Sequence, residues 1–200
     1  MIASIVYLHG FASSPASIKA RALVAFVDAL PEALRPRLRV PALQFAPREA
    51  VERVAALVRD EVPDAARALT FVGSSLGGFY AVHLAERFGA RAVLINPAMH
   101  PYDDLAQYAG TQTNLYTGEA FEVLPAHFDE LRALAVSRIA RPERFFLMVQ
   151  TGDEVLDWRE AVAFCGGAYQ LVEGGGDHGF ANFAAHIPEL LRFAGVELPR

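Results

Sequence analysis

The sequence has almost no cysteine, no cluster of basic residues and no long apolar run. Cys165 is the one cysteine of 200 residues, so no disulfide forms within the chain, and we expect a reducing, cytoplasmic setting. The sequence has 18 lysine and arginine residues and 23 aspartate and glutamate residues, which gives a net charge of −5. The basic residues are scattered along the chain, which argues against a nucleic-acid partner. No apolar run reaches the ~18 residues that cross a bilayer. Residues 1–8 also lack the basic start of a signal peptide, so we expect neither a signal peptide nor a membrane span.

Metal-ligand spacing is missing as well. Six residues are candidate ligands by type, but none follows a metal-binding spacing such as HExxH. They are His9, His100, Asp103, Asp104, Asp177 and His178. The glycine run Gly174–Gly176 lacks the lysine of a phosphate-binding loop, and Cys165 lies in an apolar run rather than a reactive polar turn. We therefore expect no metal, no cofactor and no cysteine nucleophile.

What the sequence does have is a regular alternation of apolar strand-like runs and amphipathic helical stretches. Strands are predicted at 2–8, 38–43, 69–72, 91–95, 145–150 and 168–172. Helices are predicted at 17–30, 47–62, 79–88, 125–137, 158–164 and 180–193. Because the strands are short, continuous and apolar, both faces of their sheet should be covered. The pattern predicts an α/β fold with a doubly wound, mostly parallel sheet of about six strands, in a single domain over residues 1–200.

Residues 97–125 differ from the rest of the chain. They are polar, carry little periodicity, and include Tyr102, Tyr108, Tyr116 and Phe121. A loop of this length in a compact domain is usually functional or disordered, and the aromatic residues favour function. We expect a small lid or substrate loop here, and the chain leaves no room for a large cap domain.

The segment Gly73-Ser74-Ser75-Leu76-Gly77 fits the pattern G-x-S-x-G between a predicted strand and a predicted helix. A strand that reverses into a helix within a few residues strains its central residue, and its close neighbours must be small. Ser75 would then stand clear of the sheet at a helix N-terminus, where free N–H groups favour developing negative charge. Taken alone, the pentapeptide is equally consistent with a glycine- and serine-rich turn without chemistry.

A serine nucleophile needs a base, and the base needs an orienting acid. Ser75, Asp153 and His178 occur in the order serine, acid, histidine, and Asp153 and His178 each follow a predicted strand. Asp157 is predicted to cap the helix that begins at residue 158, and Asp177 would point away from its neighbour His178. The histidines assigned to helices, with structural or surface roles, are His83, His127 and His186.

Two backbone N–H groups are needed to stabilise an oxyanion. We expect them from Leu76, directly after the nucleophile, and from Phe11, in the loop after the first strand. Gly10 would let that loop approach a substrate closely. Candidates for the substrate pocket are His9, Gly10, Ser74, His100, Tyr102, Tyr116 and Phe180, although packing roles for them remain open.

Together these segments resemble the α/β-hydrolases, and more narrowly the small YqiA-type bacterial esterases. Five segments, which span nearly the whole chain, carry the resemblance. They are Tyr7–Phe11 with Ser13–Pro15 and Lys19–Ala20; Gly73–Gly78; Asn96–Ala98; Gln150–Asp157; and Gly175–His178 with Phe180. The resemblance implies an α/β-hydrolase fold, a triad of Ser75, His178 and Asp153, and hydrolysis of carboxylic esters.

The resulting hypothesis is a serine esterase that acts on a small-molecule ester through an acyl-enzyme intermediate, with a preference for short acyl chains. Two alternatives stay open. A thioesterase or acyltransferase would use the same triad, and a non-catalytic binding protein could share the scaffold. The sequence does not indicate the oligomeric state or the physiological substrate.

Overall fold

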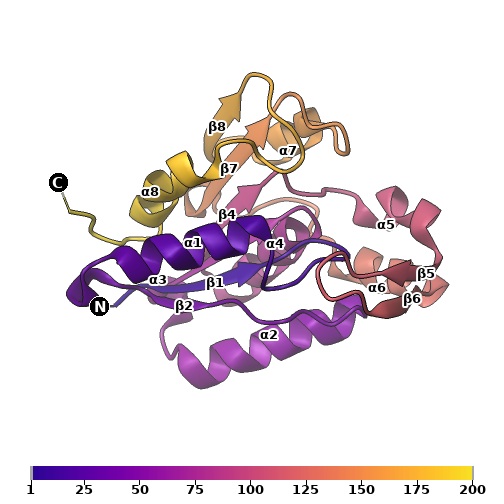
Figure 1. Ribbon diagram of the computed structural model, residues 1–200, viewed down its shortest axis with the longest axis horizontal. Coiled ribbons are helices and arrows are strands. Elements are labelled where there is room, and N and C mark those ends of the chain that lie inside the picture. The colour runs from indigo at the N-terminus through magenta and orange to yellow at the C-terminus, as the bar shows by residue number, and fades with distance from the viewer. Residues whose placement is uncertain (1, 200) are drawn as a thin grey trace.

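A six-stranded parallel sheet runs through the computed structural model, which describes residues 2–199 (Figure 1). Its strands are β1 (Ser4–Leu8), β2 (Arg37–Arg39), β3 (Leu69–Ser74), β4 (Arg91–Ile95), β7 (Phe145–Gln150) and β8 (Tyr169–Glu173). They lie in the order β2-β1-β3-β4-β7-β8, and every neighbouring pair is parallel. The predicted strand number and direction are confirmed. Strands β1, β3 and β7 are buried along their whole length, which explains their unbroken apolar runs.

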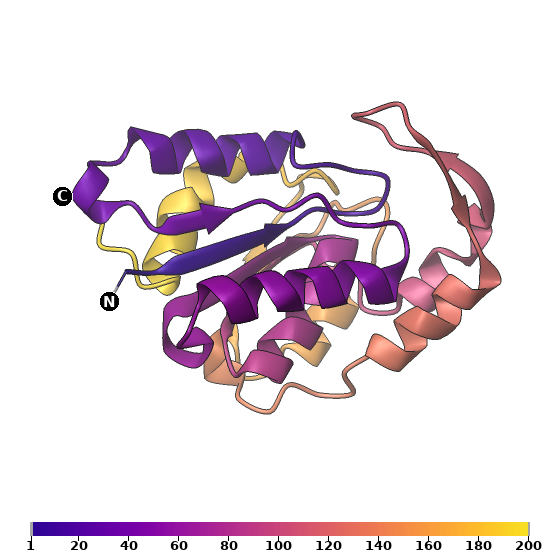
Figure 2. The same ribbon diagram turned by 90° about the horizontal axis from the view of Figure 1, so that it is seen from below.

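Helices cover both faces of this sheet, as Figure 2 shows from below. The α-helices are α1 (Ile18–Ala29), α2 (Pro47–Glu61), α3 (Ala65–Ala68), α4 (Leu76–Phe88), α5 (Pro101–Asp104), α6 (Pro125–Leu134), α7 (Trp158–Phe164) and α8 (Phe183–Phe193). The 3-10 helices are η1 (Glu32–Leu34), η2 (Ala106–Tyr108) and η3 (Pro142–Arg144). One apolar core joins the sheet to α1 and α8, and a second joins it to α2, α4 and α7. Among residues 2–199, no helix is long and apolar enough to cross a membrane.

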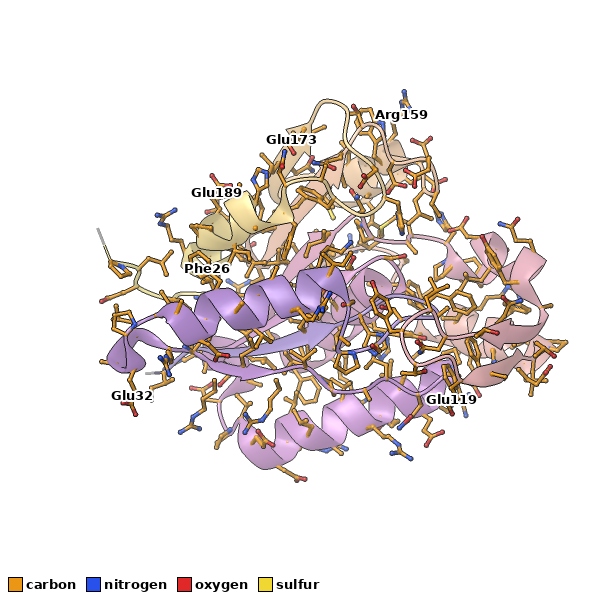
Figure 3. The ribbon with its side chains drawn as sticks, in the orientation of Figure 1. Phe26, Glu32, Glu119, Arg159, Glu173 and Glu189 are labelled. Atoms are coloured by element: carbon orange, nitrogen blue, oxygen red, sulfur yellow. The ribbon has the colours of Figure 1, made fainter. Side chains whose placement is uncertain are left out.

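Several predicted boundaries were wrong. Strand β2 covers only Arg37–Arg39, because the chain leaves the sheet before Pro41, which has no N–H for the ladder. Helix α4 begins at Leu76 rather than after Gly78, since its first glycines pack tightly against β1 and Pro97. Helix α8 begins at Phe183 and α6 ends at Leu134. Charged side chains such as Glu32, Glu119 and Glu189 project from the outer surface (Figure 3).

The segment 97–125, predicted to be an irregular loop, contains an antiparallel hairpin of β5 (Gly110–Thr113) and β6 (Ala120–Val123). The side chain of Asn114 shapes its turn by accepting hydrogen bonds from the N–H groups of Tyr116 and Thr117. On the inner face, Phe121 is stacked on Phe45 with ring centroids 4.0 Å apart. The hairpin lies beyond the carboxyl ends of the central strands (Figure 1), so it is placed to border a site at that edge.

Candidate active site

The carboxyl ends of the parallel strands bring Ser75, His178 and Asp153 together. Ser75 follows β3, Asp153 follows β7, and His178 lies in the loop after β8. The Oγ of Ser75 is 3.1 Å from Nε2 of His178, and Nδ1 of the same imidazole is 2.8 Å from Oδ2 of Asp153. Because Nδ1–H donates to the carboxylate, Nε2 is free to accept the serine proton.

The backbone around Ser75 is strained and tightly packed. Ser75 has φ 55° and ψ −124°, a conformation that costs a non-glycine residue about 1–3 kcal/mol. A Cβ on Gly77 would lie 2.1 Å from the carbonyl oxygen of Leu8, and one on Gly73 would lie 2.1 Å from that of Gly77. The strained turn is held by a hydrogen bond from the N–H of Ser75 to the carbonyl of Ile95. These close approaches are the steric reason for the two glycines of the motif.

Asp153 is well placed to stay ionised. Its side chain is 1% exposed, and its Oδ1 accepts hydrogen bonds from the N–H groups of Val155 and Leu156, both at 2.9 Å. Burial alone would raise the pKa of Asp153, but the hydrogen bonds from His178, Leu156 and Val155 outweigh it, and the pKa lies below its ordinary value. A carboxylate held in this way fixes the orientation of the imidazole.

The two rival acids have other surroundings. Asp157 caps α7 by accepting a hydrogen bond from the N–H of Arg159 at 3.0 Å, as predicted. Asp177 is exposed on the loop beside His178, and its backbone N–H and C=O, rather than its carboxylate, are held by neighbouring side chains. The geometry therefore singles out Asp153.

Phe11 and Leu76, the predicted donors to an oxyanion, both line the space around Ser75. Leu76 is the first residue of α4, so its N–H has no partner within the helix. The Phe11 ring packs against Tyr108 and Phe121, which fixes the loop after β1. A Cβ on Gly10 would lie 3.2 Å from Cβ of Ser75, so the loop passes directly beside Ser75.

The predicted pocket residues divide into two groups. Gly10, Ser74 and Tyr116 line a cleft beside Ser75. His9 does not; it is buried, and its Nε2 accepts a hydrogen bond from the N–H of Leu43 at 3.1 Å while Nδ1 faces the carbonyl of Gly10. Burial lowers the pKa of His9, which favours this neutral form. His9 therefore acts as a support for the loop after β1.

The other three candidates lie away from Ser75. His100 is on the surface beside Glu160, with 3.1 Å between Nδ1 and Oε2. Tyr102 packs against the core that contains α2, α4 and α7, with the guanidinium of Arg132 over its ring. Phe180 is 2% exposed and belongs to the core, where its ring packs against those of Phe183 and His186. The pocket roles considered for these three residues are not supported by their positions.

Two clefts meet at Ser75, and each also includes Phe11 and His178. The first, which we call the hairpin cleft, has a volume of about 390 Å³, and its walls come from the hairpin, α5, η2 and the loop after β7. The second, which we call the lysine cleft, has a volume of about 220 Å³. Besides Ser75 and His178, its polar lining consists of Tyr7, Ser13, Ser17, Lys19, Ser74 and Tyr116. Sequence reasoning missed Tyr7, Ser17 and Lys19, because nothing in their local pattern separates them from ordinary strand and helix residues.

Two buried side chains that sequence reasoning also missed as functional support the loop of His178. The amide of Asn96 donates to the carbonyls of Asp177 and His178, at 3.0 and 3.2 Å. The Oε1 of Gln150 accepts from the N–H groups of Asp177 and Ala181, at 3.2 and 2.8 Å. Asn96 and Gln150 are each 2% exposed and are joined by a hydrogen bond from the N–H of Gln150 to Oδ1 of Asn96.

The remaining candidates for reactive chemistry do not converge. Among residues 2–199, no three histidine, cysteine, aspartate or glutamate side chains are grouped to hold a metal ion. Cys165 is buried at the end of α7, and burial raises the pKa of its thiol to about 12. A protonated, buried thiol of this kind is a poor nucleophile.

Comparison with known proteins places the chain in a family. The model of the uncharacterised protein family UPF0227 matches residues 4–195. The chain belongs to the UPF0227 family. A UPF0227 protein from Shewanella sp. (strain ANA-3) is 26% identical over 196 residues, which cover 94% of this chain and 98% of that protein. The predicted resemblance to YqiA-type proteins agrees with this membership.

Solved structures identify the fold of this UPF0227 member. A candidate hydrolase from Agrobacterium vitis S4 superposes with a TM-score of 0.76 at 17% identity, over 98% of this chain and 88% of that one. The esterase domain of a Rhodothermus marinus protein superposes with a TM-score of 0.66 at 18% identity, over 94% and 84%. The predicted α/β-hydrolase fold without a large cap domain is therefore confirmed.

Proposed function

We propose that this UPF0227 protein is a serine esterase that cleaves small carboxylic esters through an acyl-enzyme intermediate. The observation that carries the proposal is the unbroken chain of hydrogen bonds from Ser75 through His178 to Asp153, with separations of 3.1 and 2.8 Å. These hydrogen bonds arrange a nucleophile, a base and an orienting acid in the geometry that serine hydrolases require.

In the first half-reaction, Oγ of Ser75 attacks the acyl carbonyl while Nε2 of His178 takes its proton. The negative charge that develops on the carbonyl oxygen is stabilised by the N–H groups of Phe11 and Leu76, and loss of one such donor typically costs about 2.7–4 kcal/mol of transition-state stabilisation. His178 then returns its proton to the departing alcohol. In the second half-reaction His178 deprotonates a water, which attacks the acyl-enzyme; the bond between the acyl carbon and Oγ of Ser75 then breaks, His178 returns the proton to Oγ, and the acid is released.

The proposal includes a preference for short acyl chains. The hairpin cleft is about 390 Å³ in volume, and its outer wall comes from 97–125 rather than from a large cap domain. Apolar side chains such as Leu105, Leu115 and Leu156 line it beside Ser75, so it suits a hydrocarbon arm of limited length.

The thioester alternative uses the same residues, so substrate comparison separates the two. We expect the protein to hydrolyse 4-nitrophenyl butanoate with a higher kcat/KM than butanoyl-CoA. A reversed preference would favour the thioesterase. Failure to turn over either compound would favour a binding protein on the hydrolase scaffold.

The nucleophile is tested by labelling with a fluorophosphonate. We expect Ser75→Ala to abolish both labelling and hydrolysis, whereas Ser137→Ala, which removes an exposed hydroxyl beyond α6, should leave both unchanged. Labelling that persists in Ser75→Ala would exclude Ser75 as the nucleophile.

A further inference from the structure

The chain contains 18 lysine and arginine residues, and Lys19 is the single lysine among them. It stands in the first turn of α1 and lines the lysine cleft next to Ser75 and His178. Its Nζ donates a hydrogen bond to the carbonyl of Gly179 at 2.9 Å. Among residues 2–199, no carboxylate lies within salt-bridge distance of this ammonium, whereas arginines such as Arg39, Arg53 and Arg87 pair with a glutamate.

The ammonium of Lys19 is only partly satisfied. It has three N–H donors, of which the bond to Gly179 uses one. Burial lowers the pKa of Lys19, and the more distant carboxylates of Asp177 and Asp153 offset part of this effect. Partial removal of a charged group from water costs free energy, and a close group of opposite charge offsets that cost. The surroundings of Lys19 therefore favour a bound anion.

A second polar group beside Lys19 also lacks a partner. Ser17 is the N-cap residue of α1, yet its hydroxyl makes no capping hydrogen bond. The side chain is 8% exposed and lines the lysine cleft beside the phenol of Tyr7, and its Oγ makes no hydrogen bond of good geometry among residues 2–199. Buried hydroxyls are normally hydrogen-bonded, so this one is placed to donate to a ligand in the cleft.

The N-terminus of α1 adds to the positive electrostatic potential in the lysine cleft. Helix α1 is 12 residues long and has no acidic residue in its first turn. The N–H of Ser17 donates to the carbonyl of Ser14, but those of Ile18 and Lys19, the first two residues of α1, have no partner within the helix, and together with the positive end of the helix dipole they border the cleft. An ammonium, an unpartnered hydroxyl and a helix N-terminus together form a recognisable site for negatively charged oxygen atoms.

We propose that the lysine cleft binds a carboxylate on one arm of the ester substrate, while the other, apolar arm lies in the hairpin cleft. This inference rests on the proposed esterase function. The two clefts meet at Ser75, so one ester can occupy both with its carbonyl at the nucleophile. One ammonium balances one negative charge, and Asp177 and Asp153 nearby disfavour a dianion, which is why we infer a carboxylate rather than a phosphate.

The experiment compares two matched pairs of esters as substrates of the whole 200-residue protein. Phenyl butanoate and 3-carboxyphenyl butanoate differ by a carboxylate on the alcohol arm, and 4-nitrophenyl butanoate and 4-nitrophenyl hemiglutarate differ on the acyl arm. The variant is Lys19→Met, which keeps the aliphatic stem and removes the charge. Arg21→Met is the control, because it removes an exposed cation from the same helix.

In at least one pair, we expect Lys19→Met to lower kcat/KM for the carboxylate ester by about tenfold or more, as for loss of a hydrogen bond to a charged group. The loss should appear mainly in KM, and the neutral partner should change little. Arg21→Met should alter neither ester. Ser17→Ala should weaken the same carboxylate ester, which provides a second variant if Lys19→Met does not fold.

Equal losses for charged and neutral esters would overturn the proposal, because Lys19 would then only hold the loop at Gly179. Unchanged kinetics in both Lys19→Met and Ser17→Ala would also overturn it. If the wild type hydrolyses none of the four esters, the esterase proposal fails by itself. The lysine cleft is then judged by calorimetry with glutaramate, a carboxylate with a single negative charge, which should bind the wild type and not Lys19→Met; absence of binding to the wild type would reject the site.

Discussion

At the scale of single residues, the partner of His178 is decided by what else each acidic side chain contacts. Asp153 has its Oδ1 fixed by two backbone N–H groups, so both of its oxygen atoms face the imidazole at 3.0 and 2.8 Å. Asp157 is committed to the first turn of α7. The same residue type therefore serves orientation at one position and helix capping four residues later.

We expect Asp153→Asn to lower kcat by roughly 10³–10⁴-fold. The amide would still accept from Val155 and Leu156, so its NH₂ group would face Nδ1 of His178. That imidazole would then carry its proton on Nε2 and could no longer accept the proton of Ser75. The measurement is kcat for 4-nitrophenyl acetate at neutral pH.

The matched control is Asp157→Asn, since asparagine caps helices about as well as aspartate. It should change kcat by less than about twofold, within the small effect of an exposed polar exchange. Wild-type kcat in Asp153→Asn, or an equal loss in both variants, would show that the acid of the site is not Asp153.

At the scale of elements, the loop between β8 and α8 carries His178 and is held by two side chains from other strand ends. Gln150 at the end of β7 binds the backbone of Asp177 and Ala181, and Asn96 after β4 binds the carbonyls of Asp177 and His178. In the proposed esterase, Gln150 and Asn96 would therefore be positioning residues, which hold the loop that carries His178.

We expect Gln150→Met to lower kcat by about 10-fold or more and to leave KM nearly unchanged, because a slightly misplaced base slows chemistry without altering the clefts. Kinetics on 4-nitrophenyl butanoate measure both. The control is Gln170→Met, which removes two similar side-chain bonds, to the carbonyls of Val162 and Cys165, without contacting the loop. If both variants lose kcat equally, the effect is general destabilisation and not positioning.

Residues whose signal lies in their own short stretch of sequence could be predicted, whereas residues placed by contacts with distant parts of the chain could not. Ser75, Asp153 and His178 each follow an apolar strand, and parallel strands bring their carboxyl ends to one edge, so local patterns were sufficient to place them. Support from Asn96 to His178 joins residues 82 apart in sequence, and no local pattern encodes it. The pattern around Lys19 predicts no role of its own, because a lysine in a helix is ordinarily a surface residue.

The errors have physical causes as well. The strands β5 and β6 expose alternate polar side chains, and their stability comes from packing on Phe45 and Phe11, which lie far away in the sequence. Phe180 follows a glycine in the loop that carries His178, which is why a pocket role was considered, but its ring packs into the core beside Phe183. Both cases depend on tertiary contacts that override local propensity.

At the scale of the whole molecule, the hairpin is a separate two-stranded sheet that is attached to the main fold at a few points. Asn114 donates to the carbonyl of Ser13, the N–H of Leu115 donates to the carbonyl of Ala12, and Phe121 packs on Phe45. Two of these contacts reach the loop that carries Phe11. The hairpin can therefore open locally at a lower free energy than the central sheet, and its position affects both clefts.

We expect Phe121→Ala to loosen this hairpin with little effect on the central sheet. Truncation of a buried phenylalanine costs about 3–5 kcal/mol, which exceeds what a two-stranded sheet supplies by itself, so the loss falls on the hairpin first. Amide exchange over residues 110–123 should become faster, while Tm changes only slightly. If the segment limits acyl length, the ratio of kcat/KM for 4-nitrophenyl octanoate to kcat/KM for 4-nitrophenyl butanoate should rise.

The control is Glu119→Ala, at the exposed hairpin turn (Figure 3), which should leave amide exchange and chain-length preference unchanged. Faster exchange with an unaltered preference would mean that the hairpin does not set the length of the acyl chain.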